Sequence, residues 1–261
     1  MTAQHRSVSQ LKLYERCPQA YKLSRIDGVW QRPAAWLAQG SAVHEAAEAY
    51  ERSNRTMTLE AAQDVFRDSY AKHIGEACEV TPHFESWFAS GPYAGELDIE
   101  RRYHIGLEQV GKYIDWYQSH PEEVIWISED GTPGIEIGFD IELDGVPVRG
   151  FIDAVIDQGE YGIWVRDNKT GNKPGDDFQL GVYAVALAEQ YGIEKPMFGD
   201  YWMGRTGKPT AVYPLDEWDR EAVTAKFRWL EEQIEAGNFP AYPEPSKCRF
   251  CDVSASCIYR A

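Results

Sequence analysis

The most constraining feature of the sequence is a change in the period of its apolar residues near Pro121. Before this proline, as in LEQVGKYIDWYQSH, apolar side chains recur every three or four positions, which is typical of an amphipathic helix. After it, the segment IEIGFDIEL (135–143) places isoleucine, phenylalanine and leucine on every odd position, which is typical of a half-buried strand. Because neither period fits the other structure, the chain must join a helical first part to a later sheet.

The sheet is predicted to start as a three-stranded meander. The dipeptide Asp144-Gly145 is a hairpin signal that leads into a second strand, VRGFIDAVI (148–156). The turn DQGE then leads into a third strand, YGIWVRDNK (161–169). Further along the chain we expect a helix over 176–192, capped by Asp176 or Asp177 and ended by Gly192, a strand over 196–204, and a helix over 215–237.

The helical part is predicted to begin with SVSQLKLYERCPQAYKL (7–23). Ser7 or Ser9 is the expected cap of this helix, and Pro18 breaks or restarts it. A second helix is expected over 40–53 with Ser41 as its N-cap, and a third is expected over 58–77.

Together these elements predict an α/β (α+β) fold in which helices flank a mixed central sheet. No internal repeat, low-complexity tract or linker interrupts the sequence. We therefore expect a single domain over 1–261, with a mainly helical part over 1–120, a sheet and helix over 121–215, and a late helix with a cysteine tail over 216–261.

Three of the five cysteines lie in KCRFCDVSASC, where Cys248, Cys251 and Cys257 have the spacing C-x2-C-x5-C. No apolar run is long enough for a membrane span, and the N-terminus lacks the apolar core of a signal peptide, so we expect a cytoplasmic protein with no membrane partner. In that reducing compartment the spacing favours metal or iron–sulfur ligation over disulfides. A four-thiolate site needs one more ligand, Cys17 or Cys78, and the spacing suits both zinc and an iron–sulfur cluster.

The charge of the chain is unevenly distributed. Against 42 acidic residues there are 26 basic ones, which gives a net charge of −16. Residues 1–32 nevertheless carry six basic and two acidic side chains, a net charge of +4, and Lys247, Arg249 and Arg260 flank the cysteine tail. If the two ends meet, they form a basic face suited to phosphates on an acidic body. The alternative is ordinary solvated charge.

Candidate chemistry concentrates in the meander. Asp153 lies among apolar residues, where an unpartnered carboxylate is costly. On the next strand, Asp167 and Lys169 are two residues apart, so their side chains leave the same face of the sheet. If these strands pair, two carboxylates converge beside an ammonium group; a hard divalent cation relieves their repulsion, and the lysine can stabilise charge on a phosphate. The alternative is a structural Asp–Lys ion pair.

Three further side chains fit the same chemistry. His44 offers an imidazole to the cation, with Glu48 one turn further along the same helix face. Gln179 and Tyr183 lie four residues apart on the helix after the third strand, where a nucleic acid could be contacted. The alternatives are a capping or core histidine and a polar stripe on a mostly apolar helix.

Six short motifs, taken in their order along the chain, resemble those of the PD-(D/E)XK nuclease superfamily. The resemblance is to its RecB-like branch with an iron–sulfur cluster, which includes AddB nuclease domains and CRISPR-associated adaptation exonucleases, and it covers nearly the whole chain. Any one match is weak, and the shared order makes the set specific. The motifs are SVSQLKLYERCPQAY, GSAVHEAAEAY, GFIDAVI, DNKTG, QLGVY and CRFCDVSASC.

The resemblance implies a restriction-endonuclease-like core whose two terminal segments are joined by a metal cluster. In this branch the first cysteine of the cluster comes from the N-terminal C-P motif, which here is Cys17. The implied cofactor is therefore a [4Fe–4S] cluster on Cys17, Cys248, Cys251 and Cys257, with Cys78 left over.

The resemblance also implies roles for residues of the meander and its neighbours. Asp153, Asp167 and Lys169 would be catalytic, His44, Asp153 and Asp167 would bind Mg²⁺ or Mn²⁺, and Gln179 and Tyr183 would bind substrate. Glu136 occupies a place where related sequences often carry an acid, and it ranks below the others. One departure is that the second acidic ligand is an aspartate rather than the more frequent glutamate, which shortens its reach.

The expected function is that of a metal-dependent DNA exonuclease, a hydrolase acting on single-stranded or frayed ends. Tyr14, Tyr21 and Trp30 could stack on unpaired bases or belong to the core. No P-loop motif is present, so any helicase action would come from a partner protein. The compatible pathways are recombination, repair, phage DNA processing and CRISPR adaptation. A phage-encoded chain would act in the host cytoplasm. The alternatives are a non-catalytic iron–sulfur subunit that binds DNA ends, a zinc-bound structural module, and an endonuclease at flaps or nicks.

Overall fold

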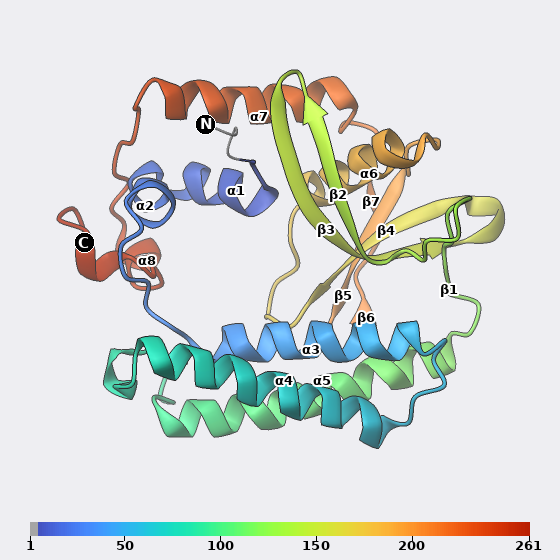
Figure 1. The fold of residues 1–261 in the computed structure, drawn as a ribbon, viewed down its shortest axis with the longest axis horizontal. Coiled ribbons are helices and arrows are strands. Elements are labelled where there is room, and N and C mark those ends of the chain that lie inside the picture. Colours follow the sequence, from blue (N-terminus) through green and yellow to red (C-terminus); the bar gives the residue numbers. More distant parts are fainter. Residues whose placement is uncertain (1–4) are drawn as a thin grey trace.

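The computed structural model describes residues 5–261 and places a mixed sheet between two groups of helices (Figure 1). The lower group in Figure 1 is α3 (Ala35–Arg52), α4 (Leu59–Val80) and α5 (Glu96–Ser119), and the upper group is α1 (Val8–Arg16), α6 (Asp177–Tyr191) and α7 (Arg220–Glu235). Shorter segments are α2 (Pro18–Tyr21), η1 (Lys22–Ile26), η2 (Phe84–Ser86), η3 (Gly159–Tyr161), α8 (Pro245–Cys248) and η4 (Ser254–Ser256). The predicted fold class, a mixed sheet flanked by helices, is confirmed.

Within residues 5–261 the sheet has seven strands and is built around the predicted meander. Its strands are β1 (Val124–Ile125), β2 (Ile135–Leu143), β3 (Val146–Asp157), β4 (Ile163–Lys169), β5 (Phe198–Met203), β6 (Lys208–Pro209) and β7 (Tyr213–Pro214). β3 pairs antiparallel with β1, β2 and β4, whereas β4 and β5 are parallel and are connected through α6. The meander therefore ends at β4, at the centre of the sheet.

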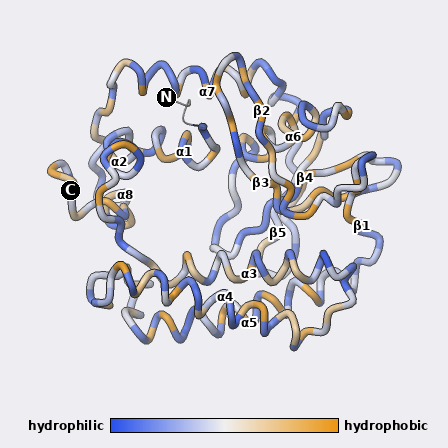
Figure 2. Tube along the Cα trace, viewed as in Figure 1, coloured by the Kyte–Doolittle hydropathy of each residue, from blue (hydrophilic) through white to orange (hydrophobic). Residues whose placement is uncertain are grey.

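Two apolar cores hold the layers together. In the first, β2 and β3 pack against α1, α6 and α7, and Figure 2 shows the alternation of hydropathy along this hairpin. The second lies among α3, α4 and α5 and is completed by Trp202 of β5. Tyr201, the residue before it, belongs to the first core, so neighbouring residues of β5 bind the two helical groups to opposite faces of the sheet.

Short polar side chains start several of these helices. Ser7 Oγ accepts a hydrogen bond from Gln10 N (3.3 Å) at the start of α1, and Asp176 Oδ1 accepts one from Gln179 N (3.3 Å) at the start of α6. Gly192 ends α6 in the left-handed region, with φ of 63°. These predicted boundaries are confirmed.

The predicted start of the second helix is wrong. α3 begins at Ala35 and runs through Gly40 and Ser41, so Ser41 lies inside the helix instead of capping it. A Cβ at position 40 would lie 3.3 Å from Thr170 Oγ1. Because residue 40 is a glycine without a side chain, α3 can pass close to Thr170 at the end of β4.

The C-terminal tail packs against the first described segments of the chain, and Figure 1 shows the C-terminus near α2 and α8. Arg32 N donates to Asp252 O (2.8 Å), and the Arg16 guanidinium donates to Lys247 O (2.8 Å). The resulting basic face is smaller than the sequence suggests, because Arg6 is buried in an ion pair with Glu231 (2.6 Å).

Two of the three aromatic residues considered for base stacking belong to the core. Tyr14 and Tyr21 are 2% and 1% exposed, and each packs against Phe239. Trp30 is 36% exposed, and its indole N–H donates to Thr81 Oγ1 (2.9 Å). Stacking on unpaired bases by Tyr14 or Tyr21 is therefore excluded in this structure. Within the described residues, no helix is long and apolar enough to cross a membrane.

The contact of α4 with α5 gives a test of the second core. A Cβ on Gly106 of α5 would lie 2.1 Å from the Phe66 ring, whereas a Cβ on Gly75 of α4 would meet nothing within 4 Å. We expect Gly106→Ala to lower the free energy of unfolding by about 1–3 kcal/mol through overpacking. The control Gly75→Ala should raise it by about 0.5–1 kcal/mol through helix propensity. Equal effects of the two variants in urea denaturation would contradict this packing.

Candidate active site and metal centre

Three side chains from different elements form a compact group of metal-ligand atoms. His44 Nδ1 of α3 lies 3.4 Å from Asp153 Oδ2 of β3 and 3.5 Å from Glu136 Oε1 of β2. One ligand atom from each residue lies within 4.8 Å of the other two. Imidazole nitrogen and carboxylate oxygens are a donor set that suits a divalent cation.

Glu136 enters this group through an unusual backbone conformation. Its φ is 45°, in the left-handed region that a residue with a Cβ seldom adopts. Such a conformation costs on the order of 1–3 kcal/mol and persists where the surrounding structure holds it. From the sequence, only the family resemblance pointed to Glu136, and it ranked below the other acids. Its contact with His44 depends on a helix some 90 positions away in the chain.

The backbone of β4 fixes the orientation of Asp153. Asp153 Oδ2 accepts a hydrogen bond from Asn168 N (2.6 Å), so the carboxylate of β3 is attached to the strand that carries Asp167 and Lys169. The predicted pairing of these two strands is present, with Ala154 opposite Arg166. Asp153 is thus attached next to Asp167 in the neighbouring strand, but among the described residues Asp167 lies outside the compact group that His44, Glu136 and Asp153 form.

Asp167 is held by three side chains. Its Oδ2 lies 2.6 Å from Lys169 Nζ, while its Oδ1 accepts hydrogen bonds from Gln179 Nε2 (2.6 Å) and Tyr183 Oη (3.2 Å). Gln179 also donates to Tyr183 Oη (2.8 Å). Gln179 and Tyr183, which the spacing placed on one face of α6, therefore reach the end of β4.

The charges of the site shift its proton affinities. Burial raises the pKa of Asp167 to about 6, and the neighbouring charge of Asp153 acts in the same direction. Burial would also raise the pKa of Asp153, but His44 outweighs it and lowers that pKa. Burial would lower the pKa of His44, but Asp153 and Glu136 raise it well above its usual value. A cation beside these carboxylates would oppose the same repulsion that raises the pKa of Asp167.

Lys12 of α1 reaches the site, and the sequence gave no specific signal for it. Lys12 Nζ lies 2.9 Å from Asp176 Oδ1 and 3.3 Å from Gln179 Oε1, an oxygen that is 3.5 Å from Lys169 Nζ. The only sequence signal was its place in the basic first 32 residues. Two lysines from distant segments thus approach one amide side chain.

Another residue of β4 that sequence reasoning passed over is Arg166. It is 1% exposed and points to the opposite face of the strand from Asp167, where its guanidinium pairs with Asp200 of β5 (2.6 Å) and with Glu123. A buried guanidinium needs such partners. The pairing attaches β4 to its parallel neighbour at the level of the site.

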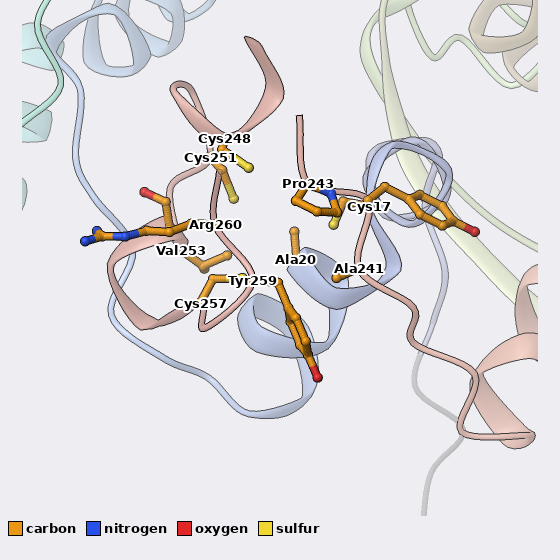
Figure 3. A pocket seen from close by; sticks show the side chains of 12 residues that line it. Cys17, Ala20, Ala241, Pro243, Cys248, Cys251, Val253, Cys257, Tyr259 and Arg260 are labelled. Carbon is orange, nitrogen blue, oxygen red and sulfur yellow. The ribbon is translucent and has the colours of Figure 1, made fainter. Parts of the chain in front are cut away.

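The four cysteines expected to act together line one cavity, shown in Figure 3. Cys248, Cys251 and Cys257 come from the tail, and Cys17 comes from the junction of α1 and α2. Cys78 lies in α4 and does not line this cavity. A single tetrahedral zinc would bring sulfur atoms to about 3.8 Å from one another. Among the described residues, no three cysteine sulfurs lie within 4.8 Å of one another.

The sequence belongs to a known family. A model of the PD-(D/E)XK nuclease superfamily matches residues 5–258, which is nearly the whole chain. The chain therefore belongs to the PD-(D/E)XK nuclease superfamily, as its motifs indicated. Its class is that of nucleases that act on DNA with divalent cations, and the His44, Glu136 and Asp153 group provides ligands of the required kind.

Two phage proteins align with nearly all of the chain. Gene 69 protein of Mycobacterium phage L5 is 54% identical over 279 residues, which covers 97% of this chain and 95% of that protein. Gene 69 protein of Mycobacterium phage D29 is 56% identical over 260 residues, which covers 97% and 96%. Among solved structures, a candidate exonuclease from Eubacterium rectale has a TM-score of 0.49 and 14% identity, covering 97% of this chain and 87% of that one.

The metal group can be tested without any activity assay. We expect Glu136→Gln to weaken Mn²⁺ binding at least about tenfold, because it removes a charged oxygen donor beside His44. Glu235→Gln, exposed at the end of α7, is the matched control because it removes the same charge at a place outside the group. Free Mn²⁺ measured by electron paramagnetic resonance reports the binding constant. Equal affinities in the two variants would remove Glu136 from the site.

Proposed function

We propose that this chain is a divalent-metal-dependent DNA exonuclease that hydrolyses phosphodiester bonds at single-stranded or frayed ends. The observation that carries the proposal is the convergence of the His44, Glu136 and Asp153 group with the buried Asp167–Lys169 pair. The RecB-like motifs of the sequence, and not the geometry, favour action at strand ends. The phage relatives favour a role in the processing of phage DNA.

The acidic residues and the histidine would hold the cation. We assign this role to His44, Asp153 and Asp167, and add Glu136 because its carboxylate is 3.5 Å from the His44 imidazole. Mg²⁺ and Mn²⁺ both fit oxygen-rich ligands with one imidazole. When bound, such a cation polarises the phosphate and lowers the pKa of a coordinated water.

Lys169 would act on the phosphate itself. Its side chain is 30% exposed, so its ammonium group is accessible from outside the site while it contacts Asp167. A positive charge in this position stabilises the negative charge that builds on the non-bridging oxygens, and its N–H groups can orient the attacking water. Gln179 and Tyr183 would hold the Asp167 carboxylate in place and border the bound strand.

We propose a [4Fe–4S] cluster on Cys17, Cys248, Cys251 and Cys257 as a second, structural cofactor. Support comes from the shared cavity of the four thiols and from its apolar lining, which includes Ala20 and Val253.

The cluster would also help to fix the position of α1, the helix that carries Lys12. Cys17 directly follows α1, and Lys12 of the same helix lies 3.3 Å from Gln179 Oε1. Fixing Cys17 to the tail therefore fixes the helix that brings Lys12 to the site. We propose that loss of the cluster weakens DNA binding before it affects the chemical step.

Replacement of the catalytic lysine separates a nuclease from a subunit that only binds DNA ends. We expect Lys169→Ala to lower the rate of cleavage by at least about 10³-fold, because it removes charge stabilisation in the transition state, while DNA affinity changes only a few-fold. Lys173→Ala, in the exposed loop that follows, is the control and should retain activity. Measurable binding without any cleavage by the unmodified protein would favour the binding subunit.

Cysteine substitutions test the cluster. Anaerobically purified protein should be brown, absorb near about 400 nm and contain about four irons per chain. We expect Cys257→Ala to lose iron and thermal stability, since one ligand and the attachment of the tail are lost. Cys78→Ala should keep both, because Cys78 lies outside the cavity. A colourless protein that contains zinc would contradict the cluster.

A further inference from the structure

A cleft with basic walls opens next to the strand end that carries Lys169. It has a volume of about 380 Å³. Its walls come from α5, from the loop after β4 and from the turn after β5. The residues that line it are Arg101, Arg102, Ile105, Glu108, Gln109, Lys112, Thr170, Asn172, Gly204 and Arg205.

One face of α5 supplies most of the charge. Arg101, Ile105, Glu108 and Lys112 are spaced by four, three and four residues, so they follow one another along the same side of the helix. With Arg102 and Arg205, the lining carries four cations and one acid, on a chain whose net charge is −16. A local concentration of one sign inside a recess attracts a ligand of the opposite sign.

The four cations of the cleft differ in how far they are already paired. Arg101 Nη1 and Arg102 Nε are buried against the same carboxylate oxygen of Asp98, at 3.7 and 3.5 Å. The Arg102 guanidinium also donates to Gln39 Oε1 (3.1 Å) and Ser90 Oγ (2.9 Å), so it is already occupied. Among the described residues, the Arg205 side chain has neither an ion pair nor a hydrogen bond. Lys112 is paired, with Glu108 at 2.6 Å. The cleft thus retains donors for an anion.

The floor of the cleft is held by buried hydrogen bonds that connect it to the candidate active site. Gln109 is 3% exposed and donates to Thr170 O (2.9 Å), and it accepts from Gln39 Nε2 (2.5 Å). A Cβ on Gly204 would lie 2.9 Å from Gln109 Cδ, so only glycine fits above this amide. Gly204 N in turn donates to Lys169 O (2.8 Å).

The cleft is within reach of a strand bound at Lys169. Thr170 follows Lys169 directly, so their Cα atoms are about 3.8 Å apart, and the Cα of Asn172 lies at most about 11 Å away. A strand bound at Lys169 would therefore need only a few nucleotides of its backbone to reach the cleft. Lys112 also donates to Arg205 O (2.9 Å), which holds the two basic walls together.

We propose that this cleft binds backbone phosphates of the DNA strand next to the bond that is cut. The proposal rests on the proposed nuclease function, and it adds a second contact region outside the metal centre. The strand would be attracted by Arg205 and Lys112 without base specificity, because phosphates carry no sequence information. The cleft would position the strand, because its phosphate contacts would determine which phosphodiester bond lies at Lys169.

The salt dependence of DNA binding tests the cleft directly. Binding of a fluorescent single-stranded DNA would be measured without divalent cations over a range of salt concentrations. Each lost phosphate contact lowers the slope of log K against log salt by about 0.7 for single strands. We expect a decrease of about 0.7 for Arg205→Ala and about 1.4 for the Arg205→Ala, Lys112→Ala double variant, with at least about tenfold weaker binding for the latter. Arg205 is exposed, so its single variant should fold normally.

The control is Arg228→Ala, on exposed surface of α7, which lies on the opposite side of the molecule from α5 in Figure 1. It removes the same charge and should leave the slope unchanged. Equal slopes for Arg205→Ala, the control and the unmodified protein would overturn the proposal, as would absence of DNA binding. Inorganic phosphate bound by the unmodified protein and lost in the double variant, with an unchanged DNA slope, would assign the cleft to a small anion and also overturn it.

A cleavage assay with Mn²⁺ on the same unmodified protein keeps the two proposals separate. Cleavage with unchanged salt slopes would leave the nuclease in place and remove the cleft from the strand path. Reduced slopes in the cleft variants without cleavage by the unmodified protein would support the cleft as a phosphate site and overturn the proposed activity.

Discussion

The candidate site depends on one hydrogen bond, from Asn168 N of β4 to Asp153 Oδ2 of β3. It holds the carboxylate of one strand beside the Asp167–Lys169 pair of the next, in a place from which most water is excluded. Two carboxylates in such surroundings repel each other, and this repulsion and burial together account for the raised pKa of Asp167. Lys169, His44 and a divalent cation are three ways of compensating the same charge.

The remainder of the fold keeps this charge cluster in place. On the opposite face of β4, Arg166 pairs with Asp200, so the strand is attached on both sides of the sheet. α6 starts beside β4 and directs Gln179 at Asp167, while α3 passes close to Thr170 because residue 40 is a glycine. The cysteine tail, the helix α1 and Lys12 add a connection from the two ends of the chain.

Local patterns in the sequence were sufficient for the four longer strands, β2 to β5, for most helices and for the positions of Asp153, Asp167 and Lys169, whereas the two-residue strands β1, β6 and β7 gave no signal. Alternation fixes which side chains share a face, and a tight turn fixes which strands pair, so short-range information determines this part. Lys12 and Arg205 could not be found in this way, because their relevance arises from contacts between distant segments. Glu136 was named only through the family resemblance, and its contact with His44 depends on a left-handed φ. Ser41 was wrongly predicted to be an N-cap, because the local sequence Gly40-Ser41 does not show that Gly40 lies inside a helix that packs against Thr170.

The most direct test of the proposed function is digestion of end-labelled, linear single-stranded DNA by the unmodified protein, followed by sizing of the earliest products. We expect release of the label in very short fragments with Mg²⁺ or Mn²⁺, none with a chelator, and resistance of a circular single strand of the same sequence. Cleavage of the circle, or internal fragments as first products, would contradict the action at ends. No cleavage with either metal would contradict the nuclease activity of this site.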